Sequence, residues 1–124
     1  MKVFTLKEAN EFLRLLIPKL SAISQLYLAI DELRPEARAA AGASNFGGGM
    51  EGGTKYVDTL YRIGKLTTEV SDTGVQLKDP LRGLIDFPSM RNERIVLLCW
   101  QLGEGEEIGW WHEIEGGFAG RQPL

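Results

Sequence analysis

Two stretches of apolar residues at helical spacing, joined by a glycine-rich segment, constrain the fold of this chain more than any other feature. In each stretch the apolar residues recur at alternating steps of four and three, which lines one face of a helix that packs lengthwise on another. The stripes comprise Ala9, Leu13, Leu16, Leu20, Ile23, Tyr27 and Ile30, and then Tyr56, Leu60, Ile63, Thr67 and Val70. Half of the residues at 42–53 are glycine, a composition typical of a connector. The pattern predicts an antiparallel helical hairpin over residues 5–73.

The hairpin has a recognisable start and end. Thr5 followed by Glu8 is a capping box, in which each residue satisfies a backbone amide of the other. Gly74 is placed to end the second helix, and beyond it the pattern changes to strands at 75–78, 84–87, 94–102 and 107–114, with turns at 88–93 and 103–106. We therefore expect an α+β fold: a long antiparallel helical hairpin packed on a small antiparallel β-meander of three to four strands. Residues 1–124 form one domain, with the meander and C-terminal tail at 74–124.

The predicted elements carry more apolar surface than one helical hairpin covers. Residues 95–100 are apolar on both faces, so this strand needs cover on each side, from the helices and from the C-terminal tail or a second copy of the chain. A second stripe flanks the first on the N-terminal helix, at Phe12, Leu15, Leu26 and Leu33. This surplus favours a non-enzymatic domain that associates with itself, as a homodimer, or with another protein.

Composition and charge exclude several classes of binding partner. The 124 residues carry 14 basic and 17 acidic side chains, a net charge of −3, and no basic stripe, so we expect no binding to nucleic acid. Residues 12–30 are rich in leucine but include Arg14, Pro18 and Lys19, which is too polar for a membrane span. With no secretory signal, the expected location is the cytoplasm. Cys99 is the only cysteine, so an intramolecular disulfide is impossible.

An alternative hypothesis is a small enzyme or ligand-binding protein with a pocket on the sheet. If Asp86 pairs with Val96 and Trp100 with Trp110, strand alternation gathers a carboxylate, an imidazole and two indoles on one face. That face would carry Asp86, Trp100, Trp110 and His112, while Cys99, Trp111 and Glu113 point the other way. His112 would then be the acid or base and Asp86 would orient it. The catalytic candidates are His112, Asp86 and Glu113.

The ligand-binding candidates are cations and aromatic walls. They are Lys78, Arg82, Trp100, Trp110 and Arg121, of which the cations would hold an anionic ligand. The same residues are also compatible with a solvated turn at 78–83 and with a buried polar cluster or a dimer interface.

Neither a metal nor a cofactor is expected. Adjacent strand residues face opposite sides, so His112 and Glu113 cannot share a metal ion, and the sequence offers too few other ligands. Gly47, Gly49 and Gly52 match a dinucleotide-binding spacing, but a helix precedes them where that motif needs a strand. We therefore interpret these glycines as a loop.

Several segments together resemble domain of unknown function 2203, a family of small bacterial and archaeal proteins. The resemblance is carried by residues 4–10 (FTLKEAN), 77–80 (LKDP), 83–88 (GLIDFP), 98–100 (LCW), 111–113 (WHE) and 117–123 (GFAGRQP). It covers both ends of the chain and most of the second half. The resemblance implies a compact domain of helices and sheet, as the residue pattern does, and it supplies no activity.

Overall fold

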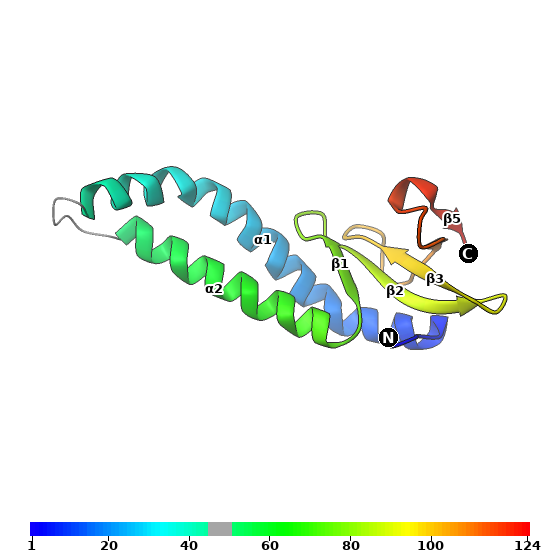
Figure 1. Ribbon diagram of the computed structural model, residues 1–124. Coiled ribbons are helices and arrows are strands. Elements are labelled where there is room, and N and C mark those ends of the chain that lie inside the picture. The colour runs from blue at the N-terminus through cyan, green and yellow to red at the C-terminus, as the bar shows by residue number, and fades with distance from the viewer. Residues whose placement is uncertain (45–50) are drawn as a thin grey trace.

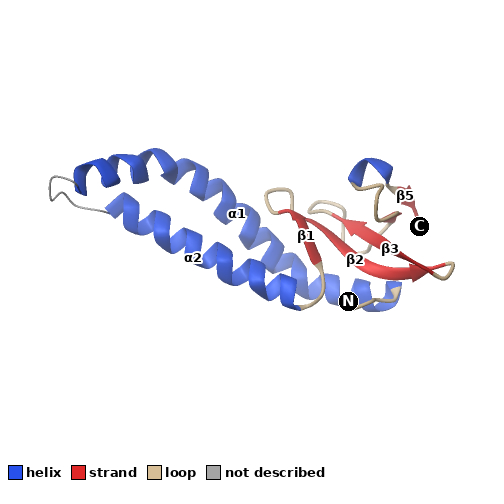
Figure 2. Cartoon of the chain, in the orientation of Figure 1, coloured by secondary structure: helices blue, strands red, loops and turns tan. Residues whose placement is uncertain are grey.

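A computed structural model describes residues 1–44 and 51–124, and it has the expected α+β architecture (Figures 1 and 2). Two long helices form an antiparallel hairpin, α1 (Leu6–Ser44) and α2 (Glu51–Asp72). An antiparallel sheet in the order β1-β2-β3-β4-β5 follows. Its strands are β1 (Gln76–Asp79), β2 (Leu84–Arg91), β3 (Arg94–Trp100), β4 (Trp110–His112) and β5 (Gln122–Pro123), with a short 3₁₀ helix, η1 (Phe118–Gly120), before β5.

The ends of the helices follow local signals. Thr5 and Glu8 form the predicted capping box, with the Thr5 amide donating to Glu8 at 2.8 Å and the Glu8 amide donating to the Thr5 hydroxyl at 3.1 Å. Residues 42–44 end α1 and 51–53 begin α2, so the predicted connector at 42–53 was too long. α1 continues past Gly42 and α2 includes Gly52 and Gly53, because each residue added to an existing helix gains a backbone hydrogen bond. Residues 45–50, with Gly47 and Gly49, lie outside the described part of the chain.

The two helices bury facing stripes, and one predicted position was wrong. The α1 stripe from Ala9 to Ile30 is buried except for Tyr27, which is half-buried. On α2, Leu60 is 45% exposed, and Thr59 is buried in its place. The Thr59 hydroxyl donates to the Lys55 carbonyl at 2.8 Å, so a polar residue is accommodated at the interface. Figure 1 shows that the far end of this hairpin extends beyond the sheet.

The N-terminal half of α1 packs against the inner face of the sheet, where the main core lies. Buried side chains from alternate positions of β2, β3 and β4 meet the α1 stripe. They are Ile85, Phe87, Val96, Leu98, Trp100 and Trp111. By length and mean hydropathy the segment Leu6–Pro35 could also cross a membrane, a test that core helices pass as well. Here its apolar stripe already packs on α2 and the sheet.

The register of the sheet differs from the predicted one. Asp86 pairs with Cys99 instead of Val96, and Trp110 pairs with Cys99 instead of Trp100. For β2 and β3 the reason is the hairpin turn: β2 continues through Pro88, and the chain reverses only at Asn92 and Glu93, both at positive φ. A two-residue turn of this kind fixes the pairing of the two strands that it joins. The pairing of β3 with β4 differs from the predicted one by a single residue, across the separate connection at 101–109. The Trp100 side chain therefore lies on the inner face of the sheet, toward α1, and the Cys99 side chain lies on the opposite, outer face.

The C-terminal tail adds a fifth strand, where three to four were expected. Gly117, at a φ of 59°, and η1 turn the chain back so that Gln122 pairs with Trp111. The tail thus lies along the outer side of the sheet (Figure 1). The sequence predicted that the tail or a second copy of the chain would cover the outer face of the central strand. The tail of the same chain supplies part of that cover.

Candidate functional site

Three buried polar side chains meet on the outer face of the sheet. Asp86 comes from β2, Cys99 from β3 and His112 from β4, and each residue as a whole is at most 2% exposed. The register places Asp86 directly opposite Cys99, and His112 opposite Leu97, so the three side chains point the same way. One potential ligand atom from each lies within 4.8 Å of the others. We refer to these residues as the polar cluster.

The hydrogen bonds of His112 fix its tautomer. Its Nδ1 lies 2.7 Å from the Glu113 carbonyl, which can only accept, so Nδ1 carries a hydrogen. Its Nε2 lies 3.1 Å from Oδ1 of Asp86. Two lone pairs cannot face each other at this distance, so a proton lies between Asp86 and His112. The pair is either a carboxylate with an imidazolium or a carboxylic acid with a neutral imidazole.

Cys99 is a hydrogen-bond donor in this cluster rather than a nucleophile. Burial, followed by the charge of Asp86 and a hydrogen bond to it, raises the pKa of the Cys99 thiol to about 12. The thiol is therefore protonated at neutral pH and donates toward Asp86. A reactive cysteine needs the opposite environment, which lowers the pKa. This setting disfavours a nucleophilic Cys99–His112 pair.

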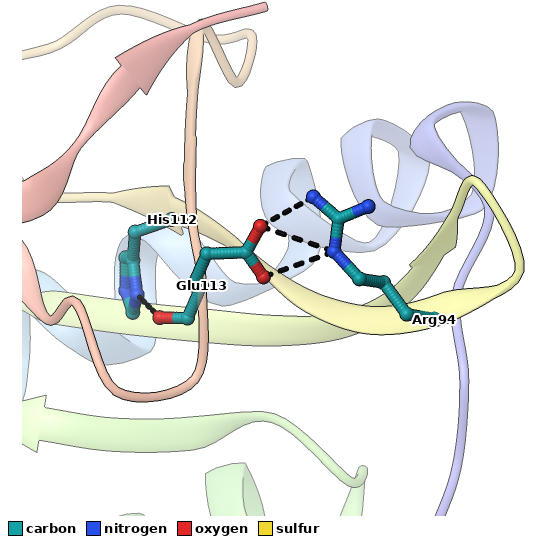
Figure 3. Close-up of polar contacts among 3 residues, drawn as sticks. All are labelled: Arg94, His112 and Glu113. Atoms are coloured by element: carbon teal, nitrogen blue, oxygen red, sulfur yellow. Dashed lines mark hydrogen bonds and ion pairs between the residues drawn. The ribbon is translucent and has the colours of Figure 1, made fainter.

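Glu113 orients the histidine through its backbone, while its side chain binds elsewhere. Its carboxylate forms a forked ion pair with Arg94, whose Nε lies 3.1 Å from both oxygens (Figure 3). These hydrogen bonds lower the pKa of Glu113 and raise that of Arg94. The carbonyl that accepts the hydrogen bond from His112 Nδ1 thus belongs to a residue whose side chain is held to β3 by Arg94. Glu113, expected as a catalytic candidate, does not present its carboxylate to the cluster.

A cavity of about 160 Å³ lies above the polar cluster. Asp86, Cys99 and His112 form one part of its lining, Lys78 contributes its only other charged side chain, and apolar groups form the rest. The apolar part comprises Leu84, Leu97, Ile114, Gly117 and Phe118. This combination of apolar walls with a few convergent polar groups is typical of small-molecule sites, although this cavity is smaller than one for a drug-sized ligand.

Arginine side chains hold the wall of the cavity in place. Two guanidinium groups contact the Phe118 ring: Cζ of Arg82 lies 4.4 Å and Cζ of Arg121 lies 4.7 Å from the ring centroid. Arg121 also donates to Glu104 at 2.6 Å and covers the Trp110 ring at 4.6 Å. Such cation–π contacts contribute about 0.5–1 kcal/mol each at exposed sites. Both arginines are therefore engaged in fixing the tail, not directed into the cavity.

The structure brings together only some of the residues that the sequence suggested. Asp86, His112 and Lys78 line one cavity. Trp110 shares their face of the sheet but is 38% exposed beneath Arg121. Trp100 was predicted on this face and is instead in the core, where its indole donates to the Gly105 carbonyl at 3.1 Å.

The main residue that sequence reasoning misplaced is Cys99, which the predicted register put on the opposite face. Asn92 carried the missing signal, because asparagine tolerates positive φ and marks two-residue hairpins. The C-terminal tail was expected as one possible cover for the open face of the sheet, and Phe118 from this tail forms a wall of the cavity there. No sequence pattern indicated that its ring would contact two arginines.

The fold and the cluster define a small α+β domain with a buried Asp–Cys–His site on its sheet. Over residues 2–124 the chain matches a family described as uncharacterized conserved protein (DUF2203), and it belongs to that family. Comparison with curated proteins and with solved structures finds no match. Function must therefore be inferred from the geometry of the site.

Proposed function

We propose that this protein binds a small organic ligand in the cavity above Asp86, Cys99 and His112. The observation that carries the proposal is that three buried polar side chains converge on the lining of one cavity. A fold of this size gains little stability from burying a shared proton and a thiol at one point, because desolvation offsets the hydrogen bonds. Convergent polar groups beneath apolar walls instead suit the recognition of a ligand.

The lining specifies the chemistry of the ligand. Leu97, Ile114 and Phe118 favour a compact apolar body, while the polar cluster favours a polar end group that reaches the floor. Lys78, exposed at the rim, adds a positive charge that favours an acid over its neutral analogue. A short-chain carboxylic acid has these properties. We propose a binding function rather than a catalytic one. Arg82 and Arg121 were expected to hold an anionic substrate, but they contact Gln101, Glu104 and aromatic rings instead.

The proposal is tested by blocking the cavity. Ile114 lines it and is 57% exposed, so Ile114→Trp fills the opening without disturbing the core. Leu28→Trp is the matched control, since Leu28 is 53% exposed on α1 and does not line the cavity. Ligand-observed NMR with short-chain carboxylic acids and their primary amides should show acids binding to the wild type and to Leu28→Trp, and not to Ile114→Trp.

Two results would contradict ligand binding at this site. The first is that no acid or amide of a size that fits the cavity binds to the wild type. The second is that binding persists unchanged in Ile114→Trp, which would place the ligand elsewhere.

A second candidate function is self-association through the outer face of α2. Val57, Leu60 and Tyr61 are 64%, 45% and 70% exposed there, and shallow grooves run beside them. Gly64 continues this face, and a Cβ added to it would meet nothing within 4 Å. A glycine inside a helix costs roughly 0.5–1 kcal/mol relative to alanine, so close approach of another helix would explain its presence.

The occupant of this face that we propose is a second copy of the chain. In an antiparallel pair of α2 helices, Val57 of one copy faces Gly64 of the other, and Asp58 approaches the opposite Lys65. Native mass spectrometry should then show a dimer that Tyr61→Glu converts to a monomer. The tyrosine on α1, Tyr27, is unsuitable as a control because it packs on the core, so the exposed Leu28 serves instead, as Leu28→Glu. A wild-type monomer at micromolar concentration would contradict this second proposal.

A further inference from the structure

We propose that Asp86, Cys99 and His112 are the three protein ligands of one divalent transition-metal ion of the Zn²⁺ class. The cavity would then lie at the fourth coordination position. This inference deepens the proposed function and rests on it in one respect: the metal would anchor the polar end of the ligand. The sequence offered too few ligands beside His112 to predict a metal site, and the register of β3 adds Cys99 to Asp86 and His112 as the third donor.

The set of donor atoms selects the class of ion. Imidazole nitrogen, sulfur and carboxylate oxygen together suit Zn²⁺ and Co²⁺, whereas Mg²⁺ and Ca²⁺ take oxygen ligands almost exclusively. Zinc sites that act on ligands commonly have three protein donors and one open position, and sites with a structural role have four. Among the residues that the structure describes, only these three form such a group. The donor count therefore fits an open site.

The spacing of the donors requires little rearrangement. Tetrahedral donors at bond lengths of about 2.0–2.3 Å lie about 3.5 Å from one another. Nε2 of His112 and Oδ1 of Asp86 are 3.1 Å apart, and all three donor atoms lie within 4.8 Å of one another. Side-chain shifts of about 1 Å would bring the three donors to these bond lengths around one ion without moving the strands.

The surroundings of His112 are those of a metal ligand. Its Nδ1–H donates to the Glu113 carbonyl at 2.7 Å, which directs Nε2 at the cluster. Metal-binding histidines almost always donate their second nitrogen to a carbonyl or carboxylate in this way. The Glu113 side chain is held in turn by Arg94, so the orientation of the imidazole is set before any ion binds (Figure 3).

The charges of the donors also suit a divalent ion. The carboxylate of Asp86 and a thiolate of Cys99 would together neutralise the two positive charges of the ion, while His112 binds it as a neutral imidazole. Protons displaced from the donors leave to solvent, and the occupied site adds no uncompensated charge to the protein interior.

Cobalt provides the sharpest test because the chain has one cysteine and one histidine. The untagged full chain, freed of metal with a chelator and then dialysed, is titrated with Co²⁺ and followed by absorption spectroscopy. A sulfur-to-cobalt charge-transfer band can come only from Cys99, so the wild type alone reports on the site and no variant needs to fold. We expect one Co²⁺ per chain, intense visible bands of a tetrahedral ion, and loss of all bands when Zn²⁺ displaces the cobalt.

Variants add a second measurement. Cys99→Ser should abolish the charge-transfer band, and both Cys99→Ser and His112→Gln should weaken binding by at least ~100-fold, beyond the usual loss from a supporting residue. Glu115→Gln removes a nearby exposed carboxylate and should bind as the wild type does. Absence of the band in the wild type, or binding that Cys99→Ser leaves unchanged, would overturn the metal site.

The outcomes separate this inference from the proposed function. A chain that binds short-chain acids but gives no cobalt–sulfur band has a ligand cavity without a metal, and the metal inference fails alone. A chain that gives the band but binds no acid supports the metal site and contradicts the organic ligand.

Discussion

Replacing Asp86 by asparagine or by leucine should have very different effects, because Nε2 of His112 needs a hydrogen-bond partner at position 86. The Nδ1–H of His112 is committed to the Glu113 carbonyl, and Nε2 lies 3.1 Å from Oδ1 of Asp86. In Asp86→Asn, the new side-chain amide supplies an N–H to Nε2 and keeps an oxygen for the Cys99 thiol. The side chain in Asp86→Leu is similar in size but supplies neither.

The magnitudes follow from burial. Both side chains of the pair are almost fully buried, at 2% exposure for His112 and 4% for Asp86. Leaving the Nε2 acceptor without a partner costs about 1–3 kcal/mol, and the lost thiol contact adds to it. We therefore expect Asp86→Leu to lower the free energy of unfolding by roughly 2–4 kcal/mol. Asp86→Asn should stay within about 1 kcal/mol of the wild type, because one neutral hydrogen bond replaces a shared proton.

Urea denaturation of the three proteins in a chelating buffer measures these differences. Asp72→Asn and Asp72→Leu are the matched controls at an exposed carboxylate, and each should change stability by less than about 0.5 kcal/mol. Equal losses in Asp86→Asn and Asp86→Leu would refute the reasoning, since the Nε2 atom would then not depend on a donor at position 86.

Three further predictions concern the turns and helices. Gly83→Ala should cost about 1–3 kcal/mol in thermal unfolding, since φ is +62° and the new Cβ would lie 2.4 Å from Leu102 Cγ; an unchanged midpoint would contradict this. Gly64→Ala, by contrast, should stabilise the helix by about 0.5–1 kcal/mol at concentrations too low for self-association. Hydrogen bonds from the Thr5 backbone and side chain lower the pKa of Glu8, so their stabilisation is present at neutral pH and lost as the pH falls through that lowered pKa. Glu8→Gln should therefore reduce the dependence of stability on pH in the acid range, measured by circular dichroism. An unchanged dependence would exclude this role of Glu8.

The helical hairpin was predictable because its information is local and repeated. The capping box and the spacing from Ala9 to Ile30 each specify the helix independently, and the buried stripe follows that spacing. The failure at Leu60 is instructive. Thr59 and Leu60 are adjacent on α2 and point in different directions. Helix packing buries the Thr59 side chain and leaves the more hydrophobic Leu60 exposed.

The site was less predictable because it depends on register. Alternation correctly placed Asp86 and His112 on one face, but it could not say which β3 residues lie beside them. That depended on the turn at Asn92 and Glu93, which sets every pairing between β2 and β3, so Cys99 and Trp100 exchanged faces. The cavity wall at Phe118 depends on contacts between distant segments, which no local pattern encodes.

The most direct test of the polar cluster as a binding site is anomalous X-ray scattering from crystals of the untagged chain grown with Zn²⁺. Data collected on both sides of the zinc absorption edge locate the ion without reference to any variant. We predict one strong peak bonded to Nε2 of His112, Sγ of Cys99 and a carboxylate oxygen of Asp86, with its fourth position facing the cavity. An intact hydrogen bond between Asp86 and His112 with no peak beside it, or zinc bound only at surface carboxylates, would contradict the account.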